Sequence, residues 1–183
     1  MKGAQIILLL LGTVGTASAQ LATAPANGSF TESVDALRNT MLKLSSEHKL
    51  TAATGEVFQY NVSIIEVSGN PSTCIVTWKD RTDLGNLIQT HTVSVNTRSI
   101  QKVLAFSSAK SKMGVDPAIE VVQVHTYPDS PLATTTESFN PDGSTRGTPE
   151  TTQSSVASIF TNSEPEATAV IKRLTDVMTK CTP

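Results

Sequence analysis

The side chains best suited to chemistry in this sequence are two histidines, each of which follows a glutamine by two residues. The stretches 89–91 (Gln-Thr-His) and 123–125 (Gln-Val-His) both have strand character, and side chains two apart on a strand point to the same face. If the two strands were neighbours, the four side chains would form a small polar face with two imidazoles, suited to ligand binding or proton transfer. The alternative is that they are ordinary surface or hydrogen-bonded strand residues. The candidate site residues are therefore Gln89, His91, Gln123 and His125.

A metal site at these histidines would need a third ligand, usually a histidine or a carboxylate, and the local sequence has none at matching spacing. The chain also lacks the C-x-x-C, H-E-x-x-H, P-loop, G-x-G-x-x-G and G-x-S-x-G motifs. The nearest match is residues 143–147 (Gly-Ser-Thr-Arg-Gly), which place Thr at the position of the nucleophile in a proline-rich turn region. We therefore expect no metal ligand, no cofactor and no catalytic residue from a known motif.

The two cysteines indicate a structural role. Both belong to the part of the chain that we expect to be exported, where thiols are normally oxidised. Cys74 begins an apolar strand face and Cys181 closes the apolar stripe of a C-terminal helix, so both should lie where helix and strands meet. We favour a Cys74–Cys181 disulfide, which closes a loop of roughly 100 residues and stabilises the fold by up to about 4.7 kcal/mol in the chain-entropy model. The alternative is two buried thiols that pack as small hydrophobes.

Residues 1–19 have the pattern of a secretory signal peptide. Lys2 supplies a positive n-region, Ile6–Leu11 an apolar h-region, and Ala17-Ser18-Ala19 a cleavage site of small residues. The apolar run is too short to cross a bilayer, and no second long apolar run follows it. We expect cleavage near Ala19-Gln20 and a soluble mature protein that is secreted or periplasmic, with no transmembrane segment.

The charge of the chain argues against nucleic acid as a partner. There are 14 Lys and Arg against 16 Asp and Glu, a net charge of −2, and only 16% of the residues are charged. The densest basic cluster is Lys110 and Lys112 with Lys102 nearby, which a solvated loop explains. Nucleic acid demands a broader basic surface than this.

The clearest element is a helix from Glu164 to Cys181. Its apolar residues recur on one face with a period of 3.6. Ser163 with Glu166 fits a capping box, and Pro165 suits the first turn. A helix with a single apolar face should pack that face against the rest of the fold. Its apolar stripe comprises Ala167, Val170, Ile171, Leu174, Val177, Met178 and Cys181.

A first helix is expected from Phe30 to about His48. Ser29 and Glu32 fit a second capping box. The narrower apolar stripe of this helix favours a position on the outside of the fold rather than at its centre. His48 at the end of the helix would interact favourably with the helix dipole. The stripe comprises Val34, Leu37, Met41 and Leu44.

Between the two helices, alternation of apolar and polar residues predicts strands. The first strand should carry a bulge near Ile65, where the parity changes, and Trp78 should point into the core from the second. Lys79–Asn86 and Ala109–Pro117 are expected to be loops. The strands, of which the sixth should be an edge strand, are expected over Glu56–Val67, Cys74–Trp78, Leu87–Val95, Ile100–Ser107, Ile119–Tyr127, Leu132–Phe139 and Thr152–Phe160.

These elements predict an α+β fold, an antiparallel β-meander or roll of about five to seven strands with an N-terminal helix and a C-terminal amphipathic helix packed on it. In architecture alone, seven strands closed by a C-terminal helix resemble the pleckstrin-homology-like roll, and no motif carries that likeness. A four- or five-stranded meander between two helices is equally compatible. The expected organisation is a signal peptide over 1–19, a flexible leader over 20–29 and a single domain over 30–183.

Two stretches match the acceptor pattern for N-glycosylation, Asn27-Gly28-Ser29 and Asn61-Val62-Ser63. The pattern has meaning only in a eukaryotic source, and Asn61 would also need an exposed strand face.

Few histidines, few aromatic residues and low charge leave little from which to build an active site. We therefore expect a non-catalytic exported domain that binds a small molecule, a protein or a component of the cell envelope. The alternative is a small secreted enzyme whose site is assembled from scattered strand and loop residues such as His91 and His125. A cavity lined by perturbed titratable groups would favour the enzyme.

Overall fold

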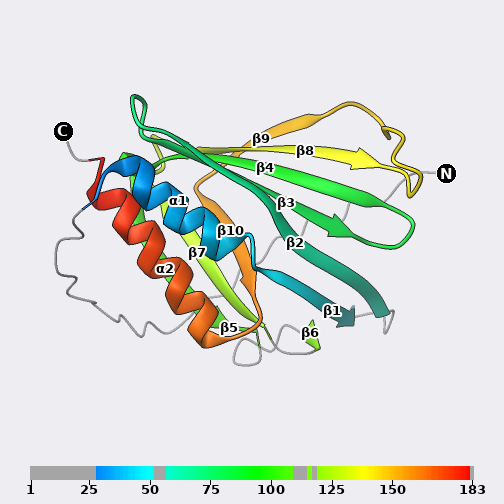
Figure 1. Cartoon of the computed structure of the whole chain (residues 1–183). Helices are drawn as coiled ribbons and strands as arrows, with labels where there is room; N and C mark the ends of the chain where they lie inside the picture. The colour runs from blue at the N-terminus through cyan, green and yellow to red at the C-terminus, as the bar shows by residue number, and fades with distance from the viewer. Residues whose placement is uncertain (1–27, 52–56, 109–114, 117–118, 182–183) are drawn as a thin grey trace.

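The structure, a computed structural model, describes residues 28–51, 57–108, 115–116 and 119–181. The expected signal peptide, nearly all of the expected leader and most of the expected loop over 109–117 lie outside the described residues. The described part of the chain has an α+β fold, with two α-helices and ten β-strands in two antiparallel sheets (Figure 1). This confirms the predicted fold class, although the strands outnumber the expected five to seven.

The elements in chain order are α1 (Phe30–Met41), β1 (Ser45–Thr51), β2 (Val57–Asn70), β3 (Ile75–Asp83), β4 (Ile88–Asn96), the 3₁₀ helix η1 (Thr97–Ser99), β5 (Ile100–Ser107), β6 (Val115–Asp116), β7 (Glu120–Thr126), β8 (Leu132–Phe139), β9 (Glu150–Ser154), β10 (Val156–Thr161) and α2 (Glu164–Thr179).

The larger sheet has the strand order β6-β1-β2-β3-β4-β8-β9, and the smaller has the order β10-β7-β5. Strands β1 to β4 form the expected antiparallel meander, and the register of β2 shifts between Ile64 and Glu66, which confirms the predicted bulge. Strand β8 pairs with β4 on one side and with β9 on the other, so the prediction that it is an edge strand is wrong.

The expected strand over Thr152–Phe160 is in fact two strands in different sheets. Strand β9 ends at Ser154 in the large sheet, and β10 begins at Val156 in the small one. The Ser154 hydroxyl accepts a hydrogen bond from the Val156 N–H at 3.0 Å and donates one to the Val156 carbonyl at 2.9 Å. Such local side-chain bonds compete with a strand ladder, and here they stand where the chain leaves one sheet for the other.

The two helices lie side by side at one end of the molecule, α1 on the large sheet and α2 on the small one, while β3, β4 and β8 run on past them toward the other end (Figure 1). Helix α1 packs against β2 and α2, and α2 also contacts β5, β7 and β10. Because both helices lie together, the alternative arrangement of a meander between two helices is not the one observed. Within the described residues no helix combines the length and apolar character needed to span a bilayer.

The first helix is shorter than predicted. The capping box of Ser29 and Glu32 is present, but α1 ends at Met41. Residues 45–51 form β1, which pairs with β2. Its buried Ser46 and His48 alternate with exposed residues, which is the period of a strand. The predicted position of His48 at a helix end is therefore wrong, and its ring lies against that of Tyr60 with centroids 5.5 Å apart.

Helix α1 packs with one face on β2 and α2, while Thr31, Glu32 and Asn39 on its other side are exposed. Leu37 and Met41 are fully buried, and the helix approaches β2 closely at Gly69. A Cβ atom at Gly69 would lie only 2.7 Å from Cγ2 of Val34, so a larger residue there would push the helix off the sheet. The apolar stripe of α1 is narrow, yet it packs between β2 and α2 and is buried over its whole length.

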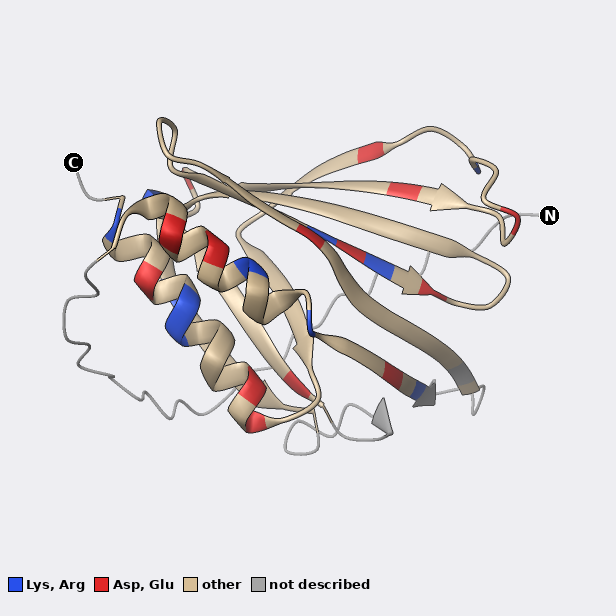
Figure 2. Cartoon of the chain, in the orientation of Figure 1, with Lys and Arg blue, Asp and Glu red and all other residues tan. Residues whose placement is uncertain are grey.

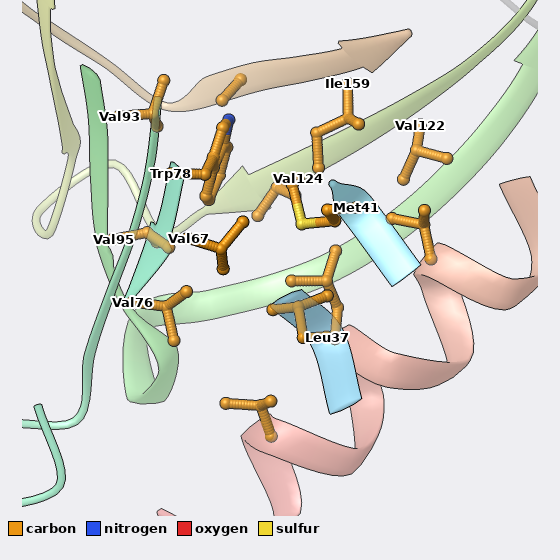
Figure 3. Close-up of a cluster of buried hydrophobic side chains, with 14 of the residues drawn as sticks. Leu37, Met41, Val67, Val76, Trp78, Val93, Val95, Val122, Val124 and Ile159 are labelled. Carbon is orange, nitrogen blue, oxygen red and sulfur yellow. The ribbon is translucent and has the colours of Figure 1, made fainter. Parts of the chain in front are cut away.

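A single hydrophobic cluster joins both sheets and both helices. Trp78 is fully buried within it, as the alternation along β3 predicted, and so is Leu174 of α2. Strands of both sheets and helix α1 supply the neighbouring side chains drawn in Figure 3, which include Leu37, Met41, Val67, Val76, Val93, Val95, Val122, Val124 and Ile159.

A disulfide between Cys74 and Cys181 ties the end of α2 to the turn before β3, which confirms the predicted bridge across 107 residues. Cys74 has φ +58°, in the left-handed region that a residue with a Cβ atom adopts only at a cost. The guanidinium Nε of Arg98 donates a hydrogen bond of 2.8 Å to the Cys181 carbonyl, so the end of the helix is held by a second contact.

Candidate functional site

The inner face of the large sheet, on which α1 packs, changes character along β3 and β4. Close to the β2–β3 turn, its cross-strand pairs are Val76–Val95 and Trp78–Val93, and all four side chains are buried. These two pairs, here called the apolar rows, belong to the same hydrophobic cluster as the helices.

The next two rows on this face begin with buried Ile64 and Val62 on β2 and are polar on the strands beyond it. They follow from the strand register, because cross-strand partners share a face and have Cβ atoms about 4.5–5.5 Å apart. Here they are called the polar rows. The first is Asp80–His91–Thr136–Glu150 on β3, β4, β8 and β9, and the second is Thr82–Gln89–Ser138 on β3, β4 and β8.

The polar rows exist because β3 is longer than the sequence suggested. The stretch Lys79–Asn86 was expected to be a loop, but β3 continues to Asp83 and stays paired with β2 and β4. The residues are polar, yet they keep the strand period, so Asp80 and Thr82 fall on the same face as Trp78. The extension places a carboxylate directly beside the imidazole of His91.

Asp80 fixes the orientation of His91. The Oδ1 atom of Asp80 lies 2.7 Å from Nδ1 of His91, and the side chains are 14% and 28% exposed respectively. An ionised carboxylate can only accept hydrogen bonds, so Nδ1 of the histidine is the donor. Among the described residues, Nε2 of His91 has no hydrogen-bond partner. This ring nitrogen is therefore able to form a hydrogen bond with a ligand.

Apart from the exposed carboxyl group of Glu150, the remaining groups of the polar rows are amide and hydroxyl donors and acceptors. The Gln89 Nε2 atom lies 3.5 Å from the Ser138 hydroxyl, at the long limit for a hydrogen bond. Thr82 and Thr136 are half-buried, and their hydroxyls make no hydrogen bond to any other described residue. Half-buried hydroxyls without protein partners are available for a polar ligand.

The second candidate pair lies elsewhere. His125 and Gln123 are on β7 of the small sheet, where His125 Nε2 lies 3.2 Å from Gln123 Oε1. Burial, and then the positive charge of Lys102, lower the pKa of His125 from its ordinary value. Because β4 and β7 belong to different sheets, the four candidate residues do not form one polar face across neighbouring strands.

The structure places no metal centre among the residues that it describes. No group of three or more His, Cys, Asp or Glu side chains there is close enough to hold an ion. The two cysteines are joined to each other, so neither is a free thiol ligand or nucleophile.

The outer face of the same strands carries charged pairs at its surface. Lys79 Nζ donates a hydrogen bond of 2.9 Å to Glu137 Oε2, and this contact lowers the pKa of the Glu137 carboxyl. Thr90 donates to the same oxygen at 3.3 Å. Among the described residues, the Lys and Arg positions visible in Figure 2 are scattered over the helices and the large sheet.

Sequence reasoning singled out His91 and Gln89 but missed Asp80, Thr136 and Ser138. Asp80 could have been found, because it lies two residues after Trp78 with the parity of an inward residue. Thr136 and Ser138 could not, since the pairing of β8 with β4 bridges about 45 residues of chain and is set by the packed fold rather than by local pattern.

Comparison of the chain with protein-family models, with curated proteins and with solved structures finds no match.

Proposed function

We propose that the protein is a non-catalytic exported domain that binds a hydroxyl-rich ligand, such as a carbohydrate of a cell envelope, on the polar rows. The observation that carries the proposal is the change from buried apolar pairs to half-buried polar pairs on one continuous sheet face. The pattern of a signal peptide over residues 1–19 supports export.

The chemistry of the polar rows suits a neutral, hydroxyl-rich ligand. Threonine and serine hydroxyls and the Gln89 amide both donate and accept hydrogen bonds, as sugar hydroxyls do. The charge of Asp80 is directed at His91 rather than at the ligand. The polar rows thus offer hydrogen-bonding groups on the three adjacent strands β3, β4 and β8, and the sheet holds these groups at a fixed spacing.

A titration with soluble oligosaccharides tests the proposal. A panel of neutral, amino and acidic oligosaccharides is added to the isotope-labelled protein, and backbone amide shifts are recorded by NMR. We expect at least one sugar to shift amides of β3, β4 and β8 around the polar rows. Thr136→Val, which replaces a hydroxyl by a methyl group, should weaken that binding. Thr92→Val, on the opposite face of β4, is the matched control and should leave it unchanged.

One observation favours an enzyme as a second candidate. An imidazole oriented by a carboxylate, with a threonine hydroxyl as its cross-strand neighbour, has the residue types of a general base and a nucleophile. However, β8 is paired with β4 and β9 on either side of Thr136, so its backbone N–H groups belong to sheet ladders and do not offer an oxyanion hole.

Hydrolysis of nitrophenyl esters and glycosides distinguishes the two candidates. A turnover that is lost in both His91→Ala and Thr136→Val, but kept in Thr92→Val, would replace the binding role by a catalytic one.

A further inference from the structure

The stretch Asn61-Val62-Ser63 lies in the middle of β2 and matches the acceptor pattern for N-glycosylation. Val62 is buried, whereas the preceding residue, Asn61, is exposed. Ser63 shares the face of Asn61, because residues two apart on a strand point the same way. The acceptor side chain and the hydroxyl of the pattern therefore both lie on the outer face of the large sheet.

The surroundings of Asn61 leave room for a large substituent. Its cross-strand partners are Glu47 on β1 and Asp83 on β3, which also point to the outer face. Neither is buried. Among the described residues the Asn61 side chain has no hydrogen-bond partner, so a modification at its amide breaks no contact within this part of the fold.

We propose that Asn61 carries an N-linked glycan when the chain passes through a eukaryotic secretory pathway. This inference depends on the export that is part of the proposed function. The Nδ2 atom of Asn61 forms a bond to C1 of the first sugar of a lipid-diphosphate-linked oligosaccharide. The bond from C1 to the diphosphate oxygen breaks, the lipid diphosphate leaves, and one Nδ2 proton is released.

A neighbouring asparagine provides an internal contrast. Asn70-Pro71-Ser72 also has Asn at the first position and Ser at the third, but proline at the middle position excludes it from the pattern. Asn70 Oδ1 also accepts hydrogen bonds from the Ser72 backbone and hydroxyl in the β2–β3 turn. The other matching stretch begins at Asn27, which lies outside the described residues.

A glycan at Asn61 would divide the large sheet between two roles. Asn61 faces away from Asp80, since Val62 and Ile64 share the inner face and Ile64 is the cross-strand partner of Asp80. The bulky, hydrated sugar would keep the outer face of β1, β2 and β3 in solvent. The polar rows on the opposite face would stay open to their own ligand.

The test uses two forms of the full chain in a cultured eukaryotic secretory cell. One keeps its own residues 1–19, and the other has them replaced by an established secretory signal peptide. Secreted protein is treated with peptide-N-glycosidase and mapped by mass spectrometry. We expect a gel-mobility shift on treatment and conversion of Asn61 to aspartate. Asn61→Gln and Ser63→Ala should each abolish both signals at this site, and Ser63→Thr, which keeps the pattern, should retain them.

The outcomes separate the glycan from export. Secreted protein with unmodified Asn61, or with sugar at Asn27 alone, would overturn the inference. Glycosylation of the second form, combined with retention of the first inside the cell, would support Asn61 as a site and contradict export by residues 1–19.

Discussion

Two parts of one sheet face share the same backbone pairing but differ in the burial and polarity of their side chains. The apolar rows and the polar rows lie on the same strands, β3 and β4, with the same antiparallel register and the same inward direction. Trp78 and Val93 are buried in the hydrophobic cluster, whereas Asp80 and His91, one row further on, are half-buried and joined by a hydrogen bond.

The difference follows from what packs on each part. Helix α1, with α2 beside it, lies at the end of the large sheet that holds the apolar rows, and the strands run on beyond the helices (Figure 1). A sheet face covered by helices must be apolar to stabilise the fold. A strand that continues past the helices is free to carry polar groups, and the ligand site that we propose lies on this part. Mutations should therefore separate the two parts.

The largest effect is expected at the centre of the apolar rows. Trp78→Ala should lower the free energy of unfolding by about 3–5 kcal/mol, because it removes a fully buried aromatic side chain. Thr82→Ala, on the same strand and face but in the polar rows, should change it by no more than about 0.5 kcal/mol. Urea unfolding midpoints measure both. Similar losses in the two variants would remove the distinction between the rows.

Helix α2, which packs on α1 and on the strands of the small sheet, should matter nearly as much. Leu174→Ala should cost roughly 2–5 kcal/mol, since Leu174 is buried in the hydrophobic cluster. Thr175 is half-buried and lies off the stripe, so Thr175→Ala should cost no more than about 0.5 kcal/mol. Denaturant melts compare the two. A wild-type midpoint for Leu174→Ala would mean that α2 does not close the core.

The disulfide should stabilise the apolar end of the molecule. The double variant Cys74→Ala/Cys181→Ala should lose about 2–4 kcal/mol, because the bridge restricts the unfolded chain. Wild-type protein with verified thiol release should show a comparable drop in the midpoint. If full reduction left the midpoint unchanged, the bridge would contribute nothing to stability.

A smaller effect is expected from the backbone at Cys74. In the absence of the bridge, Cys74→Gly/Cys181→Ala should be more stable than Cys74→Ala/Cys181→Ala by about 1 kcal/mol, because glycine adopts φ +58° without strain. The comparison uses the same denaturant melts. An alanine variant at least as stable as the glycine variant would show that the turn relaxes once the bridge is gone.

Local patterns predicted the parts of the fold that local forces decide. The capping box at Ser29, the stripe around Leu174 and the inward direction of Trp78 follow from neighbouring residues, and all are present. At the second helix only the Ser163 half of the predicted capping box forms, because the Glu166 side chain accepts from the Asn162 N–H instead. The disulfide could be predicted because few cysteines were available to pair.

The errors fall where distant contacts override local pattern. The apolar stripe through Leu44 predicted that the helix continues, although Ser46 and His48 belong to a strand. Pairing with β2 stabilises that strand. The charged stretch after Trp78 resembled a loop, although two neighbouring strands hold it in the sheet. Asp80, His91 and Thr136 come together only through the register of three strands, which could not be predicted from local sequence.

The most direct test of the account is the oligosaccharide titration of three matched proteins, namely wild type, Thr136→Val and Thr92→Val. The account predicts that a sugar shifts wild-type amides around His91 and its cross-strand partners. It also predicts that the affinity falls in Thr136→Val and is kept in Thr92→Val, while the unfolding midpoints of all three proteins stay close together. Binding that maps to the outer face, or the absence of any shift at the polar rows across the whole panel, would contradict it.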